Sequence, residues 1–91
     1  MPSTVITLTN QKGLHARAAA KLATAAGQFE SHIKARCLGC GPWVDGKSVM
    51  SLMLLAAACG TELELEADGH DAEAALAAIC ALIEDRFEEG E

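Results

Sequence analysis

The chain has 91 residues, 51% of them hydrophobic and 22% charged, which supports one globular domain over 1–91 and no second core. Its net charge of −6 argues against nonspecific binding to nucleic acid or anionic membranes. The longest apolar run, 52–59, is far shorter than the roughly 20 residues of a membrane-spanning helix. Because the first residues also do not resemble a secretory signal, we expect a cytoplasmic protein.

In chain order, the first half alternates short strands with one helix. Period-two alternation predicts strands at 4–9 and 31–37, and a run of helix-forming residues predicts a helix over 16–26. Residues 38–42 are rich in Gly and Pro and predict a turn, after which 43–44 form a short extended segment.

The second half predicts two more helices around one strand. A helix is expected from about Ser48 toward Ala58, with Gly60 ending it, and the last helix runs from 71 to about 87. Between them, 61–67 alternates strictly and predicts a strand. We therefore expect an α+β fold in which three helices cover one face of a four-stranded antiparallel sheet.

The strand at 61–67 predicts that the other face of the sheet is wet. Its leucines would face the helices, whereas three alternate glutamates would face water, namely Glu62, Glu64 and Glu66. Lys34 and Arg36 lie on the outward positions of the strand at 31–37. We expect these basic side chains to pair with the glutamates across strands.

Charge along the chain singles out His15. Residues 1–29 contain no acidic residue but hold three basic ones, Lys12, Arg17 and Lys21. His15 falls at the start of the predicted helix, where unpaired backbone N–H groups bind anions and a protonated ring is disfavoured. A neutral ring nitrogen there is a candidate nucleophile, with Arg17 placed to hold an oxyanion. The alternative is an exposed helix cap without chemistry.

The second predicted helix has a polar start and an unusually apolar body. Ser48, preceded by Lys47, has the pattern of an N-cap, and a phosphate on it would be stabilised by the helix end and the lysine. The helix has more apolar positions than one buried stripe requires: Val49, Met50 and Met53 form one set, and Leu52 and Leu55 another. One set would pack on the sheet and the other would bind partners, or both would belong to a wider core contact.

Four cysteines allow a different function. Cys37 and Cys40 form a CxxC sequence, but no second CxxC or spaced histidine pair completes a zinc set, so no metal site is predicted. The alternatives are a small metal-binding or redox module and two accessible thiols in a turn. Cys80 fits a helical core position. His32 and His70 are interpreted as surface residues.

Three segments in register are similar to the HPr family, the histidine phosphocarriers of the bacterial phosphotransferase system. They are GLHARAA at 13–19, GKSVMSLMLLAA at 46–57 and GTELELEADGHDAEAAL at 60–76. The resemblance implies an open-faced sandwich with sheet order 1-4-2-3, and a carrier that is not an enzyme and needs no cofactor. It implies that His15 accepts a phosphoryl group from Enzyme I and passes it to an EIIA domain, with Arg17 stabilising the phosphoryl group.

The same resemblance implies regulation and docking. Ser48 matches the serine that HPr kinase/phosphorylase modifies, and an apolar docking surface is implied beside the histidine, formed by Ala16, Ala20, Val49, Met50 and Met53, with Lys47 next to it. A monomer is expected. Two features depart from the family: Ala18 stands where proline is common, and the segment around 37–42 is longer. The HARA and MLLAA sequences look more like versions from regulatory phosphotransferase chains than from sugar transport.

Overall fold

The computed structural model describes residues 2–9, 13–55, 60–85 and 87. Within these ranges, seven elements follow one another: β1 (Ser3–Thr7), α1 (Ala16–Gly27), β2 (His32–Cys37), β3 (Cys40–Asp45), α2 (Val49–Met53), β4 (Glu62–Asp68) and α3 (Ala72–Glu84). The strands form one antiparallel sheet in the order β1-β4-β2-β3. The predicted fold and strand order are confirmed.

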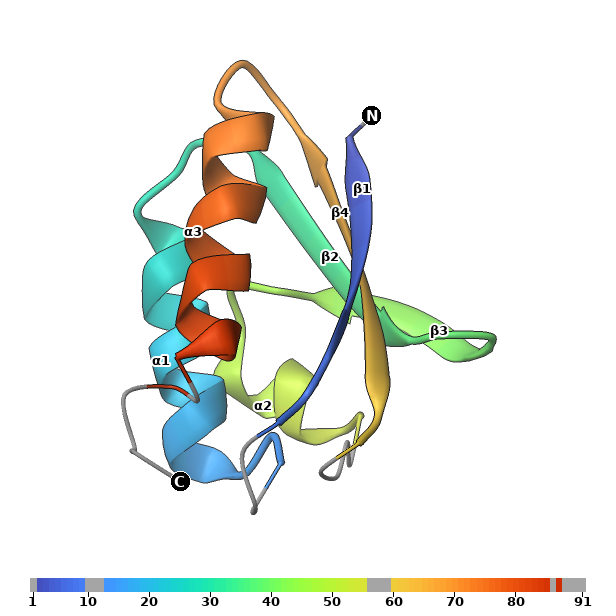
Figure 1. Cartoon of the computed structure of the whole chain (residues 1–91). Helices are drawn as coiled ribbons and strands as arrows, with labels where there is room; N and C mark the ends of the chain where they lie inside the picture. Colours follow the sequence, from blue (N-terminus) through green and yellow to red (C-terminus); the bar gives the residue numbers. More distant parts are fainter. Residues whose placement is uncertain (1, 10–12, 56–59, 86, 88–91) are drawn as a thin grey trace.

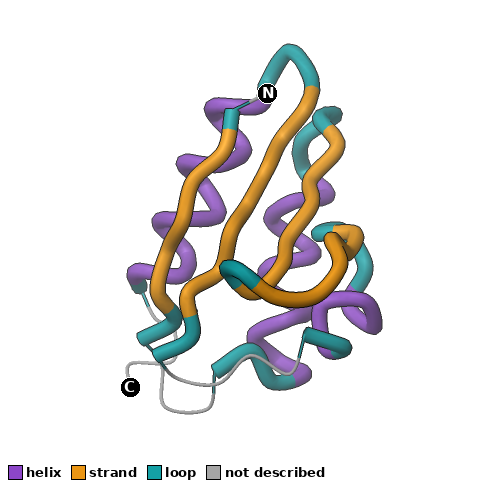
Figure 2. The backbone as a smooth tube through the Cα atoms, turned by 90° about the vertical axis from the view of Figure 1, so that its right-hand side faces the viewer, coloured by secondary structure: helices purple, strands orange, loops and turns teal. Residues whose placement is uncertain are grey.

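The helices all lie on one side of the sheet. Figure 1 shows α1 and α3 side by side to the left of the strands, with α2 beside the end at which α1 begins. Figure 2, turned by 90°, shows the strands in one layer with the helices behind them. None of the helices in the described part of the chain is long and apolar enough to span a bilayer. The described elements thus form two layers, and among them no helix covers the second face of the sheet.

Small and aliphatic side chains fill the space between the two layers. Three alanines of α1 are fully buried, Ala18, Ala19 and Ala26, which lets this helix approach the strands closely. The largest fully buried side chains come from every layer of the fold: Leu8, Leu22, Ile33, Leu52, Leu63, Leu65, Ile79, Ile83 and Phe87. Burial of such apolar surface is the main force that holds the helices on the sheet.

The open face of the sheet carries the charges predicted for it. In the register of β2 and β4, Arg36 lies opposite Glu64 and Lys34 opposite Glu66. The Nε atom of Arg36 donates to Oε1 of Glu64 at 2.7 Å, and its guanidinium lies 4.4 Å from the centre of the Trp43 ring. The expected pairing of basic and acidic side chains is confirmed by the register and, for Arg36, by a direct contact.

The β2–β3 connection is tighter than the sequence predicted. The turn is confined to Leu38 and Gly39, and Gly39 has a positive φ of 78° that favours glycine. The predicted turn over 38–42 is wrong because β3 already begins at Cys40. β3 is an edge strand with an irregular register, and proline is tolerated in such strands, which explains Pro42.

α2 and α3 end earlier than predicted, whereas α1 ends within one residue of its predicted end. α2 stops at Met53, because the N–H of Leu54 bonds to the carbonyl oxygens of both Met50 and Ser51 and so tightens the last turn. The rest of the predicted helix, 56–59, lies outside the described residues. α3 ends at Glu84 rather than near Phe87.

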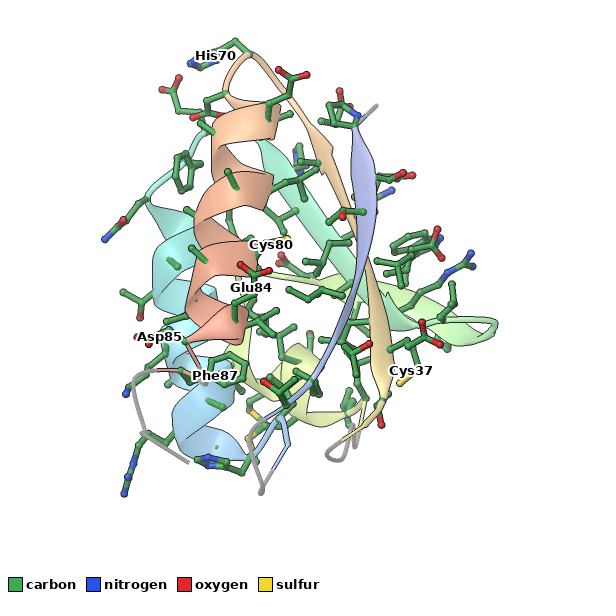
Figure 3. All side chains as sticks on the ribbon, viewed as in Figure 1. Cys37, His70, Cys80, Glu84, Asp85 and Phe87 are labelled. Atoms are coloured by element: carbon green, nitrogen blue, oxygen red, sulfur yellow. The ribbon has the colours of Figure 1, made fainter. Side chains whose placement is uncertain are left out.

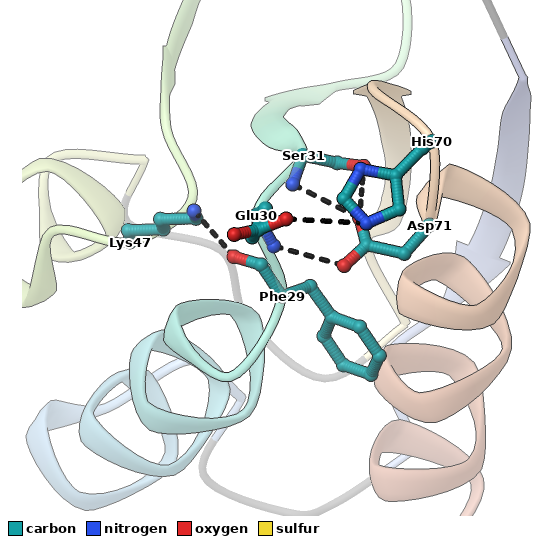
Figure 4. Close-up of polar contacts among 6 residues, drawn as sticks. All are labelled: Phe29, Glu30, Ser31, Lys47, His70 and Asp71. Carbon is teal, nitrogen blue, oxygen red and sulfur yellow. Dashed lines mark hydrogen bonds and ion pairs between the residues drawn. The ribbon is translucent and has the colours of Figure 1, made fainter.

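A network of hydrogen bonds, the connector clasp, joins two loops at one end of the molecule. The carboxylate of Asp71, before α3, accepts the backbone N–H groups of Glu30 and Ser31 at 2.9 and 3.0 Å, and also the Ser31 hydroxyl (Figure 4). These bonds stabilise the charged carboxylate and lower the pKa of Asp71 from 3.8 to about 2. His70 contacts Glu30 at 3.2 Å in the same network.

Candidate functional site

His15 is the N-cap of α1, as its sequence context predicted. Gly13, with a positive φ of 65°, turns the chain, and Leu14 is almost fully buried, so the next residue is held at the helix start. The backbone of His15 is extended, and its carbonyl oxygen accepts the Ala19 N–H at 2.8 Å. Its ring nitrogen Nδ1 accepts the Arg17 N–H at 3.2 Å, so the ring itself caps the helix.

This geometry assigns different roles to the two ring nitrogens. Because Nδ1 accepts a hydrogen bond, it carries a lone pair, and in the neutral ring the proton is on Nε2. Nε2 is buried, whereas the ring as a whole is half-exposed. Nδ1 also lies at the positive end of the α1 dipole, where negative charge is stabilised. The arrangement is that of a nucleophile next to an anion-binding helix end.

The basic residues near His15 in the sequence do not all place a positive charge at the start of α1. Arg17 is exposed in the first turn of α1, close to the ring in sequence and through its N–H. Lys21 instead donates from Nζ to the carbonyl oxygen of Phe87 at 2.5 Å, which ties α1 to a residue that follows α3. Lys12 lies outside the described residues. Arg17 is therefore the cation that the described structure places at this helix end.

Ser48 is the N-cap of α2, also as predicted. Its Oγ accepts the Ser51 N–H at 3.3 Å, and the side chain is half-exposed. The preceding Lys47 donates from Nζ to the carbonyl oxygen of Phe29 at 2.7 Å (Figure 4). Lys47 thus bridges the start of α2 and the segment after α1, a contact that no sequence pattern indicates.

The apolar side chains of α2 divide between the core and the surface. Leu52 is fully buried, whereas Met50 is 78% and Met53 45% exposed, so the expected division is confirmed. Val49 differs from the expectation, because it is half-buried against the core. Leu54 is 79% exposed and was not predicted, although its spacing of four from Met50 would have placed it on the same side.

The two residues of α1 that were predicted to bind partners also differ in how exposed they are. Ala16 is exposed and Ala20 is half-buried, and α1 packs against α2. We use the name α2 patch for the exposed apolar side chains that α2 and its C-cap present, Met50, Met53 and Leu54. The α2 patch belongs to the helix that packs against α1, whose cap is His15.

The described part of the chain holds two of the four cysteines with their side chains, Cys37 and Cys80. Within the described ranges, no group of three His, Cys, Asp or Glu side chains could hold a metal ion. The thiol of Cys37 donates to the carbonyl oxygen of Leu55 at 3.7 Å. Cys80 is half-buried against the core, and its burial together with the Glu84 charge raises the pKa of its thiol. Figure 3 shows Cys37 and Cys80 on different elements.

His32 and His70 are both exposed, as expected. Figure 3 shows His70 at the opposite end of the molecule from Phe87, the residue that Lys21 contacts. Neither of them is the N-cap of a described helix: His32 lies in β2, and His70 directly precedes Asp71, the N-cap of α3, so His15 is distinguished from the other two by its capping role.

Fold and site together define a small α+β domain of two layers that presents a histidine at a helix start, with the ring nitrogen Nδ1 accepting a backbone N–H. A family model described as the PTS HPr component phosphorylation site matches residues 2–85. The chain belongs to the HPr family, the phosphocarriers of the phosphotransferase system, and is therefore a carrier and not an enzyme.

Individual relatives match over almost the whole chain. The phosphocarrier protein HPr of Pseudomonas aeruginosa is 46% identical over 93 residues, covering all of both chains, and that of Cupriavidus necator is 49% identical over 85 residues, covering 93% of each. A crystal structure of HPr from Thermoanaerobacter tengcongensis matches with a TM-score of 0.91 and 37% identity over 98% of both chains. The family resemblance predicted from the sequence is confirmed. Membership of the HPr family therefore takes precedence over the alternative function, a small metal-binding or redox module built on CxxC.

Proposed function

We propose that this chain carries a phosphoryl group on Nδ1 of His15, accepting it from phosphorylated Enzyme I and passing it to an EIIA domain. The observation that supports this most directly is the hydrogen bond from the Arg17 N–H to Nδ1. It means that the nitrogen at the helix end already has the lone pair that attack on phosphorus requires. Membership of the HPr family supplies the phosphotransferase context.

Each transfer exchanges one bond to phosphorus for another. The Nδ1 lone pair attacks phosphorus, a bond between Nδ1 and phosphorus forms, and the bond to the donor group of Enzyme I breaks, its electron pair returning to the donor. The Arg17 N–H, released from Nδ1, then donates to a phosphoryl oxygen, and the Arg17 guanidinium adds a charged donor. Transfer to EIIA repeats the exchange with this chain as donor.

Both partners would dock on the surface around His15. We assign to it Ala16 and Ala20 of α1 and the α2 patch, with Val49 and Lys47 at its edge. Exposed methionines suit a surface that binds several partners, because their flexible side chains adapt to different shapes. A carrier that exchanges partners in this way needs each surface to be accessible, so we expect a monomer. The cytoplasm is where we expect the relay.

Ser48 is the proposed regulatory position, modified by HPr kinase/phosphorylase. A phosphate there would bring about −1.5 to −2 charges to the start of the docking helix. Those charges would repel an acidic partner surface and slow the docking of Enzyme I. The half-exposed hydroxyl at a helix start is compatible with such a modification.

The experiment that tests the relay is intact-mass spectrometry. The full chain is incubated with phosphoenolpyruvate and Enzyme I from the same organism, in parallel with His15→Ala and His70→Ala. We expect one acid-labile phosphoryl adduct on the unaltered chain and on His70→Ala, and none on His15→Ala. An adduct that persists on His15→Ala would contradict the assignment. Sedimentation velocity of the same samples tests the monomer.

A further inference from the structure

Two of the three methionines of the chain lie together on α2. Met50 and Met53 are three positions apart, which places them on the same side of a helix. Both side chains are exposed, Met50 the more so, and small solutes can therefore reach both sulfur atoms. Met1 lies outside the described residues. Within the described chain, thioether chemistry is therefore confined to the α2 patch.

Other side chains hold α2 in place. Leu52 is fully buried in the core, and Val49 and Leu55 are half-buried against it. The start of the helix is completed by Ser48, whose Oγ accepts the N–H of Ser51. A polar change at the methionines would therefore alter what the helix presents at its surface while the contacts that anchor it remain.

We propose that Met50 and Met53 are a reversible oxidation site that controls docking, an inference that rests on the proposed function of the α2 patch. The oxidant is hydrogen peroxide. A methionine sulfur attacks one peroxide oxygen, an S–O bond forms, and the O–O bond breaks, with its electron pair leaving on hydroxide. The hydroxide takes the proton of the new S–OH group, so the products are a sulfoxide and water.

The reverse step needs a reductant of a known class, the methionine sulfoxide reductases. Two thiols of the reductase are oxidised to a disulfide, the sulfoxide is reduced to the thioether, and its oxygen leaves as water. Because oxidation creates a chiral sulfur, each sulfoxide epimer requires its own reductase. Exposure of both sulfur atoms on one helix suits this repair, since the reductase must reach them in the folded protein.

A sulfoxide changes the chemistry of the α2 patch. The thioether is apolar and adapts to different partner shapes, whereas the sulfoxide is polar and its oxygen accepts hydrogen bonds from water. Docking would remove that oxygen from water, which is unfavourable unless the partner supplies a donor. The His15 ring lies on α1, not α2, so its nucleophilic nitrogen is unchanged. We therefore expect oxidation to weaken docking and to leave the phosphoryl-accepting group intact.

Mass spectrometry tests the modification itself. The full chain, mixed with free methionine, is treated with hydrogen peroxide, desalted, and then treated with dithiothreitol to restore reversibly oxidised thiols. Trypsin releases Met50 and Met53 on one peptide, 48–86. We expect fragmentation to locate one added oxygen atom on each methionine, first on Met50, and a mixture of both reductases to remove them. Side chains that stay unoxidised while the free methionine reacts would overturn the proposal.

Phosphorylation by Enzyme I and phosphoenolpyruvate tests the consequence for docking. We expect the concentration of carrier that gives half-maximal phosphorylation to rise about tenfold after oxidation and to return after reductase treatment. An untreated sample that forms no adduct would contradict the proposed relay. An untreated sample that is phosphorylated, together with an unchanged half-maximal concentration after oxidation, would overturn this inference and leave the relay standing.

A double variant, Met50→Leu with Met53→Leu, makes the result specific. Leucine is apolar, close to methionine in volume and equally favourable in a helix, but it has no sulfur to oxidise. Each protein is compared with its own untreated sample, so an effect of the substitutions on docking does not enter the result. Peroxide should leave the half-maximal concentration of the variant unchanged. An equal rise in the variant would assign the effect to another group and overturn the proposal.

Discussion

At the scale of single residues, His15 has two tasks. In the unphosphorylated protein its ring completes the start of α1, and in the proposed relay the same Nδ1 lone pair attacks phosphorus. The two tasks are compatible because a phosphoryl group brings its own oxygens to the helix end. The N–H group that bonded to the ring can then bond to oxygen, so the helix start keeps an acceptor in both states.

Arg17 provides the first prediction. Arg17→Ala removes a charged donor from the helix end, and a hydrogen bond to a charged group contributes about 1.5–3 kcal/mol, so phosphorylation of His15 should slow about 10- to 100-fold. The backbone N–H of residue 17 remains, and therefore the cap of α1 should survive. The rate of adduct formation with Enzyme I measures the effect.

Lys34→Ala is the matched control for this prediction. It also removes one positive charge, but from the open face of the sheet, and should leave the rate within about twofold because exposed distant charges are screened. Equal slowing in the two variants would mean that net charge, rather than position at the helix end, determines the rate.

At the scale of elements, α2 is a short helix that presents much of the proposed docking surface. It has one fully buried side chain, Leu52, and with its C-cap it presents the three apolar side chains of the α2 patch. A short helix depends on tertiary packing for its stability, since isolated short helices are marginal in water. Leu52 therefore holds the element in place while its neighbours remain available to partners.

Leu54 gives a prediction for the α2 patch. Leu54→Ser removes an apolar side chain that is 79% exposed, so stability should change little, while the concentration of carrier giving half-maximal phosphorylation by Enzyme I should rise about tenfold. Leu38→Ser is the control, because Leu38 is also exposed, at 43%, but lies in the hairpin turn. If both variants behave like the unaltered chain, Leu54 does not take part in docking.

Ser48 gives a prediction that separates capping from charge. Aspartate is as good an N-cap as serine, so Ser48→Asp should keep the stability of the protein and still slow phosphorylation of His15 through its negative charge. Ser48→Ala loses the acceptor for the Ser51 N–H and should reduce the free energy of unfolding by about 1 kcal/mol without slowing phosphorylation. Urea unfolding and adduct formation are measured on both; equal rates for Ser48→Asp and the unaltered chain would exclude the charge effect.

Local patterns in the sequence predicted the elements better than their ends. Alternation identified β4, and the caps at His15 and Ser48 were both indicated by residue type and position. The turn over 38–42 was wrong because glycine and proline are also tolerated in an irregular edge strand, which only the partner strand reveals. The contact of Lys47 with Phe29 joins segments distant in sequence, and no local pattern encodes it.

At the scale of the whole molecule, the connector clasp joins the helical layer to the sheet. Asp71 lies before α3, and the N–H groups that it accepts lie between α1 and β2. Gly69, in the same turn, has a φ of 154°, and a Cβ there would come within 2.7 Å of the Ser31 backbone. The close approach of the two connectors therefore needs both the carboxylate and the glycine.

The clasp predicts how stability depends on pH. Because folding lowers the pKa of Asp71 from 3.8 to about 2, its contribution is fully present above about pH 4 and is lost as the pH falls toward 2. Asp71→Asn should therefore unfold at lower urea concentration than the unaltered chain at neutral pH, and the difference should shrink between pH 4 and 2. Ser31→Ala, which removes one donor, should show a smaller difference that shrinks over the same interval. A difference that stays constant down to pH 2 would contradict the role of the charge.

The stacked Trp43 ring has a practical consequence for spectroscopy. It is the only tryptophan of the chain, which has no tyrosine, and it lies in the hairpin that carries Cys37 rather than in α1 or α2. Ultraviolet emission from this protein therefore comes almost entirely from one fluorophore, on the open face of the sheet. Trp43 emission is therefore an optical reporter of the β2–β3 hairpin, and we expect it to stay unchanged when His15, at the start of α1, is phosphorylated.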